Sequence, residues 1–149
     1  MSQDQSKMRW VLGVLGGIAI LVYLAMSNAR SPDGSTPPII TPMAFDAALA
    51  ANTENDTLLV VKATASWCPP CKEMNRTSMR DENVELFIRE HGVAIELDVD
   101  DHPDTARTLR VEAMPTMIAF RKGKEIARHV GFLDARQLLA WLTRETRAK

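Results

Sequence analysis

The chain has 149 residues, of which 46% are hydrophobic and 25% are charged. This composition is typical of a globular protein and excludes collagen-like, mucin-like and disordered low-complexity chains. Eighteen Lys and Arg residues against nineteen Asp and Glu give a net charge of -1, so the basic excess that nucleic-acid binding needs is absent. Cys68 and Cys71 are the chain's two cysteines, too few for a framework of several disulfides. The fold must therefore depend on an apolar core.

Residues 10–29 form an uncharged, mostly apolar stretch near the N-terminus. At about 1.5 Å per helical residue, a stretch of this length spans roughly 30 Å, the thickness of the hydrocarbon core of a bilayer. It therefore predicts a single transmembrane helix. Lys7 and Arg9 precede it, whereas only Arg30 follows closely. The positive-inside rule then places residues 1–9 in the cytoplasm as a short tail and exports the rest of the chain.

A cleaved signal peptide is the alternative, because Ser27-Asn28-Ala29 has the small-x-small pattern of a cleavage site and would release a secreted protein after Ala29. The apolar stretch is longer than the usual signal-peptide core of about 7–15 residues, which favours the uncleaved anchor. Both interpretations export everything after the stretch. Residues 30–42 follow with four prolines, one glycine and two serines. This composition predicts an extended linker before a domain at 43–149.

The domain at 43–149 alternates helix-type and strand-type patterns along the chain. Five helices are predicted. The first is short and starts at Thr41-Pro42, the second covers residues 72–79, and the third follows Asp81 as its cap. The fourth covers residues 103–109, and the last follows Asp134 as its cap. The predicted strands are 58–61, 93–99, 117–120 and 126–130, the last two joined in a hairpin, with a further short strand possible at Ile39-Ile40. This order predicts an α/β fold with a central mixed sheet flanked by helices.

The segment Trp67-Cys68-Pro69-Pro70-Cys71-Lys72 concentrates the chemistry of the chain. The two cysteines lie between a buried-type strand and the opening of a helix, where unpaired N–H groups and the helix dipole stabilise a thiolate. In such motifs the thiol pKa falls from about 8.5 to about 3.5–7.5. Cys68 is therefore predicted to be a nucleophile, and the more buried Cys71 to attack a mixed disulfide formed on it. Pro69 and Pro70 suit the first turn of the helix, stiffen the loop and so modulate the reduction potential.

Metal binding is the main alternative for the cysteine pair. Zinc usually takes four ligands, and the sequence has no second pair of cysteines and no pair of histidines at ligand spacing. A copper site formed by the two thiolates stays open. The acidic cluster Asp98-Asp100-Asp101 lacks the spacing of a calcium loop, and a strand end that leads into a helix cap explains it more simply. The sequence therefore predicts neither a metal site nor a cofactor.

Residues 60–72 resemble the active-site strand and turn of the thioredoxin family, and Met114-Pro115-Thr116 resembles its cis-proline loop. The combination of WCxxCK with a downstream x-Pro-Thr before a strand is specific, and the resemblance runs from about residue 39 to residue 142. It implies the thioredoxin fold. Within the family, residues 71–77 look most like the periplasmic thioredoxin-like domains of bacterial membrane-bound disulfide reductases.

The resemblance implies a role for each residue of the site. Cys68 corresponds to the attacking cysteine and Cys71 to the resolving one. Pro115 corresponds to the cis-proline, whose bend brings its loop beside the sulfurs and lets the backbone of Met114 pair with an extended substrate segment. Trp67 corresponds to the indole that flanks the site.

Lys62 departs from the family pattern. Six residues before its first cysteine, the family commonly has a buried carboxylate that relays a proton to or from the resolving thiol. An ammonium group near Cys71 would favour its thiolate instead of accepting its proton, so the general-base role cannot be transferred to Lys62. We expect the charged end of Lys62 to reach solvent. If Lys62 modulates the site instead, Lys62→Asp will change the pH dependence of disulfide exchange.

Together these features predict a membrane-tethered thiol–disulfide oxidoreductase that reduces the disulfides of extracytoplasmic proteins. Its domain would lie on the periplasmic side of a bacterial cytoplasmic membrane, and a membrane protein would supply its electrons. No nucleic acid is expected as a partner. The same steps in reverse would oxidise a substrate, and the non-enzymatic alternatives are a copper carrier that uses both thiolates and a redox-silent chaperone that uses the groove at Pro115.

Overall fold

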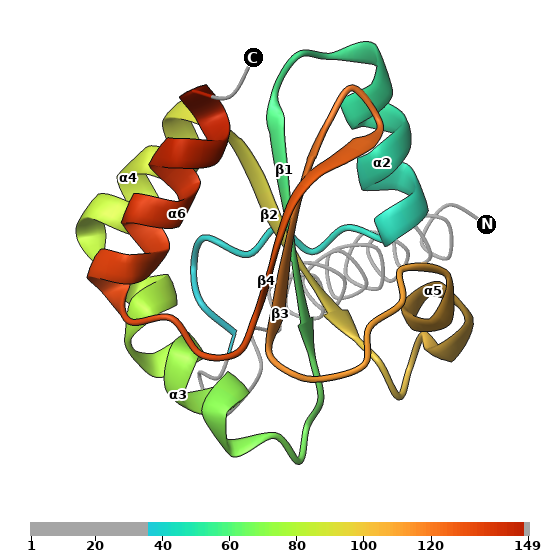
Figure 1. The fold of residues 1–149 in the computed structure, drawn as a ribbon, viewed down its shortest axis with the longest axis vertical. Coiled ribbons are helices and arrows are strands. Elements are labelled where there is room, and N and C mark those ends of the chain that lie inside the picture. The colour runs from blue at the N-terminus through green and yellow to red at the C-terminus, as the bar shows by residue number, and fades with distance from the viewer. Residues whose placement is uncertain (1–35, 148–149) are drawn as a thin grey trace, which may run out of the picture. The chain divides into compact units, whose positions relative to one another are not determined.

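The computed structural model of the chain describes residues 36–147 (Figure 1). The predicted tail at 1–9 and the predicted membrane span at 10–29 lie outside the described residues. Within 36–147, no helix is both long and apolar enough to cross a bilayer. The structure thus describes residues 43–147 of the predicted domain together with residues 36–42 of the predicted linker.

A four-stranded mixed sheet in the order β2-β1-β3-β4 forms the centre of the domain. Its strands are β1 (Leu58–Thr64), β2 (Gly92–Asp98), β3 (Thr116–Arg121) and β4 (Lys124–Val130). β1 and β2 are parallel, whereas β3 is antiparallel to both β1 and β4. The predicted mixed sheet with its closing hairpin is therefore confirmed.

Helices cover both faces of this sheet (Figure 1). They are α2 (Phe45–Glu54), α3 (Pro69–Arg76), the 3₁₀-helix η1 (Ser78–Arg80), α4 (Glu82–His91), α5 (Pro103–Thr108) and α6 (Ala135–Arg147). α3, α4 and α6 lie on one face, and α2 and α5 lie on the other. The chain from β1 to the parallel strand β2 passes through α3, η1 and α4, as a crossover connection requires.

The predicted caps of two helices are confirmed. Asp81 Oδ1 accepts hydrogen bonds from the N–H groups of Asn83 and Val84 at the start of α4. At the start of α6, Asp134 Oδ1 accepts from the N–H of Gln137 at 2.8 Å, and the Gln137 side chain accepts from the N–H of Asp134 at 3.0 Å. This reciprocal pair is a capping box, which satisfies two N–H groups that would otherwise lack partners.

The first described helix begins later than the signal at Thr41-Pro42 predicts, and that expectation is wrong. Ile40 forms a parallel bridge with Ala94 of β2, and the N–H of Thr41 donates to the carbonyl of Ala94 at 2.8 Å. The chain is still extended there, so the helix starts at Phe45. Ile39 is also buried. The last residues of the predicted linker at 30–42 are therefore packed against the sheet.

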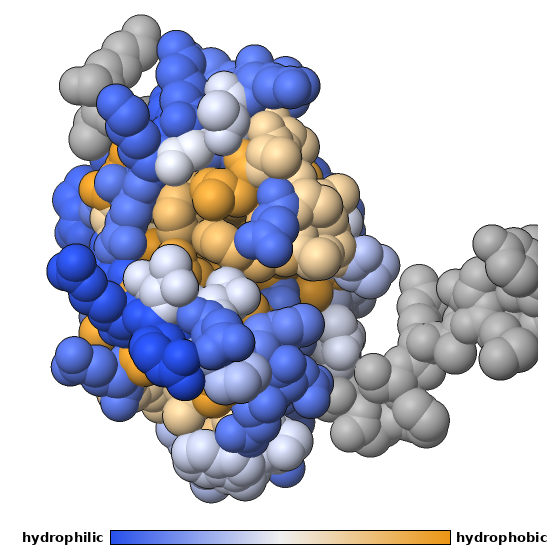
Figure 2. Space-filling view, turned by 90° about the vertical axis from the view of Figure 1, so that its right-hand side faces the viewer, coloured by the Kyte–Doolittle hydropathy of each residue, from blue (hydrophilic) through white to orange (hydrophobic). Residues whose placement is uncertain are grey.

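Two apolar clusters fill the space on the two faces of the sheet. β1 contributes to both clusters, since its residues 58–63 are all buried and successive side chains point to opposite faces. The cluster beneath α2 and α5 reaches the surface through the partly buried Phe45, Leu49 and Val111, and Figure 2 shows apolar surface on this side of the molecule. The opposite cluster packs beneath α3, α4 and α6 and extends toward the cysteine motif.

Candidate active site

The cysteine motif occupies the turn between the carboxyl end of β1 and α3. Cys68 is the N-cap residue of α3, and Pro69 and Pro70 fill the first helical positions, as predicted. The N–H of Cys71 donates a hydrogen bond to the sulfur of Cys68 at 3.3 Å. The helix start therefore presents an N–H donor to the sulfur on which the sequence predicts a thiolate.

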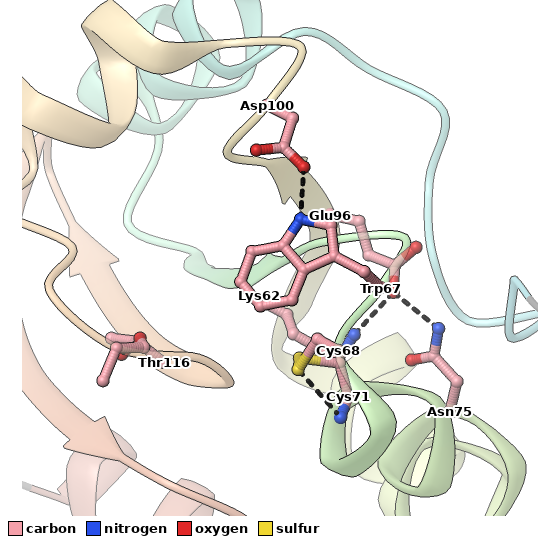
Figure 3. The surroundings of a disulfide bond; sticks show 9 residues. Lys62, Trp67, Cys68, Cys71, Asn75, Glu96, Asp100 and Thr116 are labelled. Atoms are coloured by element: carbon pink, nitrogen blue, oxygen red, sulfur yellow. Dashed lines mark hydrogen bonds and ion pairs between the residues drawn. A yellow bond between two sulfur atoms is a disulfide. The ribbon is translucent and has the colours of Figure 1, made fainter.

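Cys68 and Cys71 form a disulfide with an Sγ–Sγ distance of 2.01 Å (Figure 3). Their Cα atoms are 5.3 Å apart, so the two sulfurs can bond without a shift of the backbone. Cys68 is 3% and Cys71 is 1% exposed. The predicted difference in burial is thus small, and both sulfurs sit in a small apolar cluster with Ala65.

The loop before β3 lies beside this disulfide. Its peptide bond between Met114 and Pro115 is cis, and Met114 packs against the cluster that contains Cys68 and Cys71. The carbonyl of Pro115 accepts a hydrogen bond from the N–H of Gly131 at 2.8 Å, which ties the loop to the end of β4. The structure therefore brings together the motif at 67–72 and a loop more than forty residues further along the chain. The role of the loop in substrate binding stays a prediction.

Trp67 lies at the surface next to the disulfide. It is 62% exposed, and its indole Nε1 donates a hydrogen bond to Asp100 Oδ2 at 2.7 Å. Asp100 follows β2 and belongs to the acidic cluster that was interpreted as a strand end leading into a helix cap. The bond to Trp67 shows that this carboxylate also orients the indole. Sequence reasoning missed this pairing, because nothing in the local sequence connects the two positions.

Lys62 is fully buried, so the expectation that its charged end reaches solvent is wrong. The residue lies on a central strand, on the face that α3 covers, and its Nζ donates to Glu96 Oε1 at 2.7 Å. Glu96 stands directly opposite Lys62 in the parallel pairing of β1 and β2. Burial lowers the pKa of Lys62 below its ordinary value of 10.5, and the negative charges of Glu96 and Asp98 oppose that shift.

Asn75 completes this group of side chains and was not predicted. Its Nδ2 donates to the same Glu96 Oε1 atom at 2.8 Å. Asn75 comes four residues after Cys71 on α3, so both residues lie on the same face of the helix. That spacing was the available signal for Asn75. The sequence signal for Glu96 was weaker, since Glu96 is only a polar residue within a strand predicted to be half-buried.

Among residues 36–147, no three or more His, Cys, Asp or Glu side chains are grouped closely enough to hold a metal ion. A copper ion held by Cys68 and Cys71 would first require the bridge between them to open, because thiolates and not disulfide sulfurs are the ligands.

A bridged pair of cysteines at the start of a helix can gain two electrons and become a dithiol, and a dithiol can give them to another disulfide. The fold and this site define a thiol–disulfide oxidoreductase. The cysteine pair supplies the reacting sulfurs.

A family model described as "Thioredoxin" matches residues 37–144. Thioredoxin of Echinococcus granulosus is 41% identical over 90 residues, which cover 59% of this chain and 78% of that protein. Thioredoxin-1 of Saccharomyces cerevisiae is 40% identical over 89 residues, which cover 58% and 77%. The solution structure of a thioredoxin from Thermus thermophilus shares the fold with a TM-score of 0.65 at 23% identity, over 73% of this chain and 88% of that one. The chain belongs to the thioredoxin family.

Proposed function

We propose that this protein is a membrane-tethered reductase of disulfides in extracytoplasmic proteins. The observation that carries the proposal is the Cys68–Cys71 pair at the start of α3, beside the loop with cis Pro115. The apolar stretch at 10–29 supports the tether and its orientation, because its flanking charges follow the positive-inside rule. The resemblance of residues 71–77 to periplasmic reductase domains supports the direction of electron flow.

The reaction moves two electrons from the dithiol to the substrate. The Cys68 thiolate attacks one sulfur of a substrate disulfide, that bond breaks, and the first substrate thiolate leaves. The Cys71 thiolate then attacks Cys68 Sγ in the mixed disulfide, so the second substrate thiolate leaves and the Cys68–Cys71 bridge closes. The substrate is reduced and the enzyme is oxidised. A membrane protein that carries reducing equivalents outward would restore the dithiol.

Exposed apolar side chains at the cysteine motif and next to the cis-proline loop support binding of an unfolded or extended protein segment. Trp67, Val130 and Phe132 are 62%, 56% and 42% exposed, although each is a large apolar residue. Val130 pairs with Thr116 at the end of the cis-proline loop, and Phe132 follows the glycine that bonds to Pro115. A group of exposed apolar residues beside a reactive site is typical of a surface that binds other proteins. We propose that the backbone of Met114 pairs with the bound segment.

Reduction of insulin disulfides by the full chain in detergent, with a thiol donor, tests the proposal. The wild-type protein should turn over, whereas Cys68→Ser should lose at least about 100-fold in rate because the nucleophile is gone. Cys71→Ser should still attack and should accumulate the mixed disulfide on Cys68. A chaperone would keep its substrate binding in Cys68→Ser and would show no turnover in the wild type.

The reduction potential of the Cys68–Cys71 pair tests the direction of electron flow. A value near about -270 mV supports a reductase, and a value near about -120 mV supports the reverse reaction, oxidation of substrates. Stoichiometric copper on the purified protein without any turnover would instead support a carrier. Pro69, Pro70 and Lys62 are the positions at which we expect substitutions to shift this potential.

A further inference from the structure

Three polar side chains form a buried group next to the disulfide, on the face of the sheet that α3 covers. Lys62 of β1 and Asn75 of α3 both donate hydrogen bonds to Glu96 Oε1 of β2, at 2.7 and 2.8 Å. Figure 3 shows the two dashed bonds converging on Glu96 beside the cysteines. Three different elements thus hold one carboxylate close to the redox-active pair.

The position of this group connects it to Cys71 in particular. Asn75 lies one helical turn beyond Cys71 on the same face of α3. Cys71 and Lys62 are almost completely buried, at 1% and 0% exposure. The Glu96 side chain is 18% exposed. Glu96 is therefore the member of the pair with Lys62 that solvent reaches.

The sulfur chemistry described above does not say which group accepts the proton of Cys71. Once Cys68 has formed the mixed disulfide, Cys71 is a buried free thiol. It must lose its proton before it can attack, because the thiolate is the nucleophile. A charged Lys62 has no lone pair to accept that proton, and the Asn75 amide is not basic. The Glu96 carboxylate can accept it. Asp98, two residues further along β2, binds the N–H of Asp100 through Oδ1 at 2.9 Å.

We propose that Glu96 is the proton acceptor for Cys71, and that Lys62 and Asn75 are positioning residues that hold its carboxylate. The inference rests on the proposed function, in which Cys71 resolves the mixed disulfide. The proposal assigns the acid–base step to Glu96 of β2. In the family pattern, the carboxylate is commonly at the position that Lys62 of β1 occupies here. In this chain the buried cation is therefore on β1, and the carboxylate is opposite it on β2.

The proposed step balances. The Cys71 S–H bond breaks and its proton goes to a Glu96 oxygen, which gives a Cys71 thiolate and a neutral carboxylic acid. The thiolate displaces the substrate sulfur from Cys68. Glu96 then releases the proton to solvent or to the leaving thiolate. When the pair is reduced again, Glu96 takes up a proton from solvent and passes it to the Cys71 thiolate.

Two features of the group suit this role. Asn75 Oδ1 is buried and accepts no hydrogen bond within the described structure; in Figure 3 the dashed bond to Glu96 comes from the Asn75 nitrogen. It can accept the S–H that appears on Cys71 after reduction. Burial also lowers the pKa of Lys62, and the charge of Glu96 opposes this shift. Neutralising Glu96 leaves the buried ammonium without its counter-charge, which favours rapid return of the proton.

Acid-quenched mixing of the reduced full chain with a peptide disulfide, followed by mass spectrometry, separates attack by Cys68 from resolution by Cys71. In Glu96→Gln we expect the rate of attack by Cys68 to stay within about threefold of the wild-type rate. The rate of resolution by Cys71 should fall on the order of 100-fold, so the mixed disulfide should accumulate. Without an acceptor, resolution should also rise about tenfold per pH unit below the thiol pKa, because only spontaneously ionised Cys71 reacts.

Asp98→Asn is the matched control, because it removes a neighbouring carboxylate from the same strand. Glu96 is paired with Lys62 of β1 and bonded to the uncharged Asn75 of α3, and the negative charge of Asp98 also acts on Lys62. We expect Asp98→Asn to resolve at the wild-type rate with the wild-type pH profile. Slow resolution in Asp98→Asn together with normal resolution in Glu96→Gln would overturn the assignment to Glu96.

The double variant Lys62→Met/Glu96→Gln addresses the unpaired buried ammonium that Glu96→Gln leaves behind. We expect it to fold and to show the same slow, strongly pH-dependent resolution. Resolution within threefold of wild type, with an unchanged pH profile, in either folded variant would refute the role of Glu96 and leave the reductase function intact. Absence of any mixed disulfide with the wild-type protein would refute the proposed function itself.

Discussion

Lys62 is a cation on the central strand of a sheet, with no exposed surface. Removing an ammonium group from water costs several kcal/mol, and a single partner offsets that cost only with good geometry. Glu96 provides such a partner at 2.7 Å, and its own second hydrogen bond, from Asn75, holds the carboxylate in place. A buried pair of this kind is a poor source of stability compared with apolar packing. Its retention next to a redox site is better explained by chemistry than by folding.

The pH dependence of stability tests the burial of Lys62. Its pKa in the folded protein is lowered below 10.5 by desolvation, so between that lowered value and 10.5 the unfolded chain binds more protons. The free energy of unfolding must then rise with pH across this interval, by at most about 1.4 kcal/mol per pH unit. Denaturation of the oxidised protein, compared with Lys62→Met between about pH 8 and 10.5, should show the wild type gaining stability relative to the variant. A constant difference would contradict the lowered pKa.

Two helix caps and the strand patterns were the best-predicted features of the fold, whereas the predicted helix at 72–79 is in fact α3 at Pro69–Arg76 followed by η1. Asp81 and Asp134 were expected to cap helices from residue type and the apolar period that follows, and both do. These features are local, since the cap and the N–H groups it satisfies lie within three or four residues. The first helix was placed wrongly because its start is decided by the bridge between Ile40 and Ala94, residues far apart in the sequence.

The capping box of α6 gives a prediction at the scale of one element. Asp134→Ala removes the acceptor for the N–H of Gln137, so we expect the free energy of unfolding to fall by about 1 kcal/mol. Asp46→Ala is the control: it removes an acidic residue from the first turn of α2 without removing a cap, and should cost only a few tenths of a kcal/mol. Urea denaturation of both variants measures the difference. Equal losses in the two variants would contradict a specific contribution from the cap.

At the scale of the whole molecule, the described domain and the apolar stretch at 10–29 have different physical requirements. The domain buries its apolar side chains between its own sheet and helices. An uncharged stretch long enough to cross a bilayer is stable in lipid without any tertiary partner. In the function proposed above, a membrane anchor at 10–29 would set the compartment in which this domain works.

Cell fractionation tests the anchor. The full chain should sediment with membranes and should be released by detergent but not by high salt or alkaline carbonate, because the span is held by apolar burial and not by charge. A chain that starts after residue 29 should be found in the soluble fraction. Recovery of a soluble mature protein whose N-terminus follows Ala29 would instead establish the cleaved signal peptide.

The sequence by itself determined the features that depend on neighbouring residues. The reacting sulfurs, their place between a strand and a helix, the prolines of the first turn and the helix caps all follow from spacing over a few positions. A specific family resemblance extended this to Pro115 and its cis bond. These are local or inherited patterns, which a single chain displays without being folded.

Only the tertiary structure decided what happens between strands and helices that meet in space. Gly92 illustrates the reason: a Cβ atom at this position would lie 1.7 Å from the Leu58 carbonyl oxygen, a constraint that arises only when β2 pairs with β1. The bond from Trp67 to Asp100 and the burial of Lys62 with Glu96 and Asn75 arise in the same way. The residue type shows whether a side chain can carry a charge. Its partner and its exposure to water depend on which strands and helices pack against it in the folded protein.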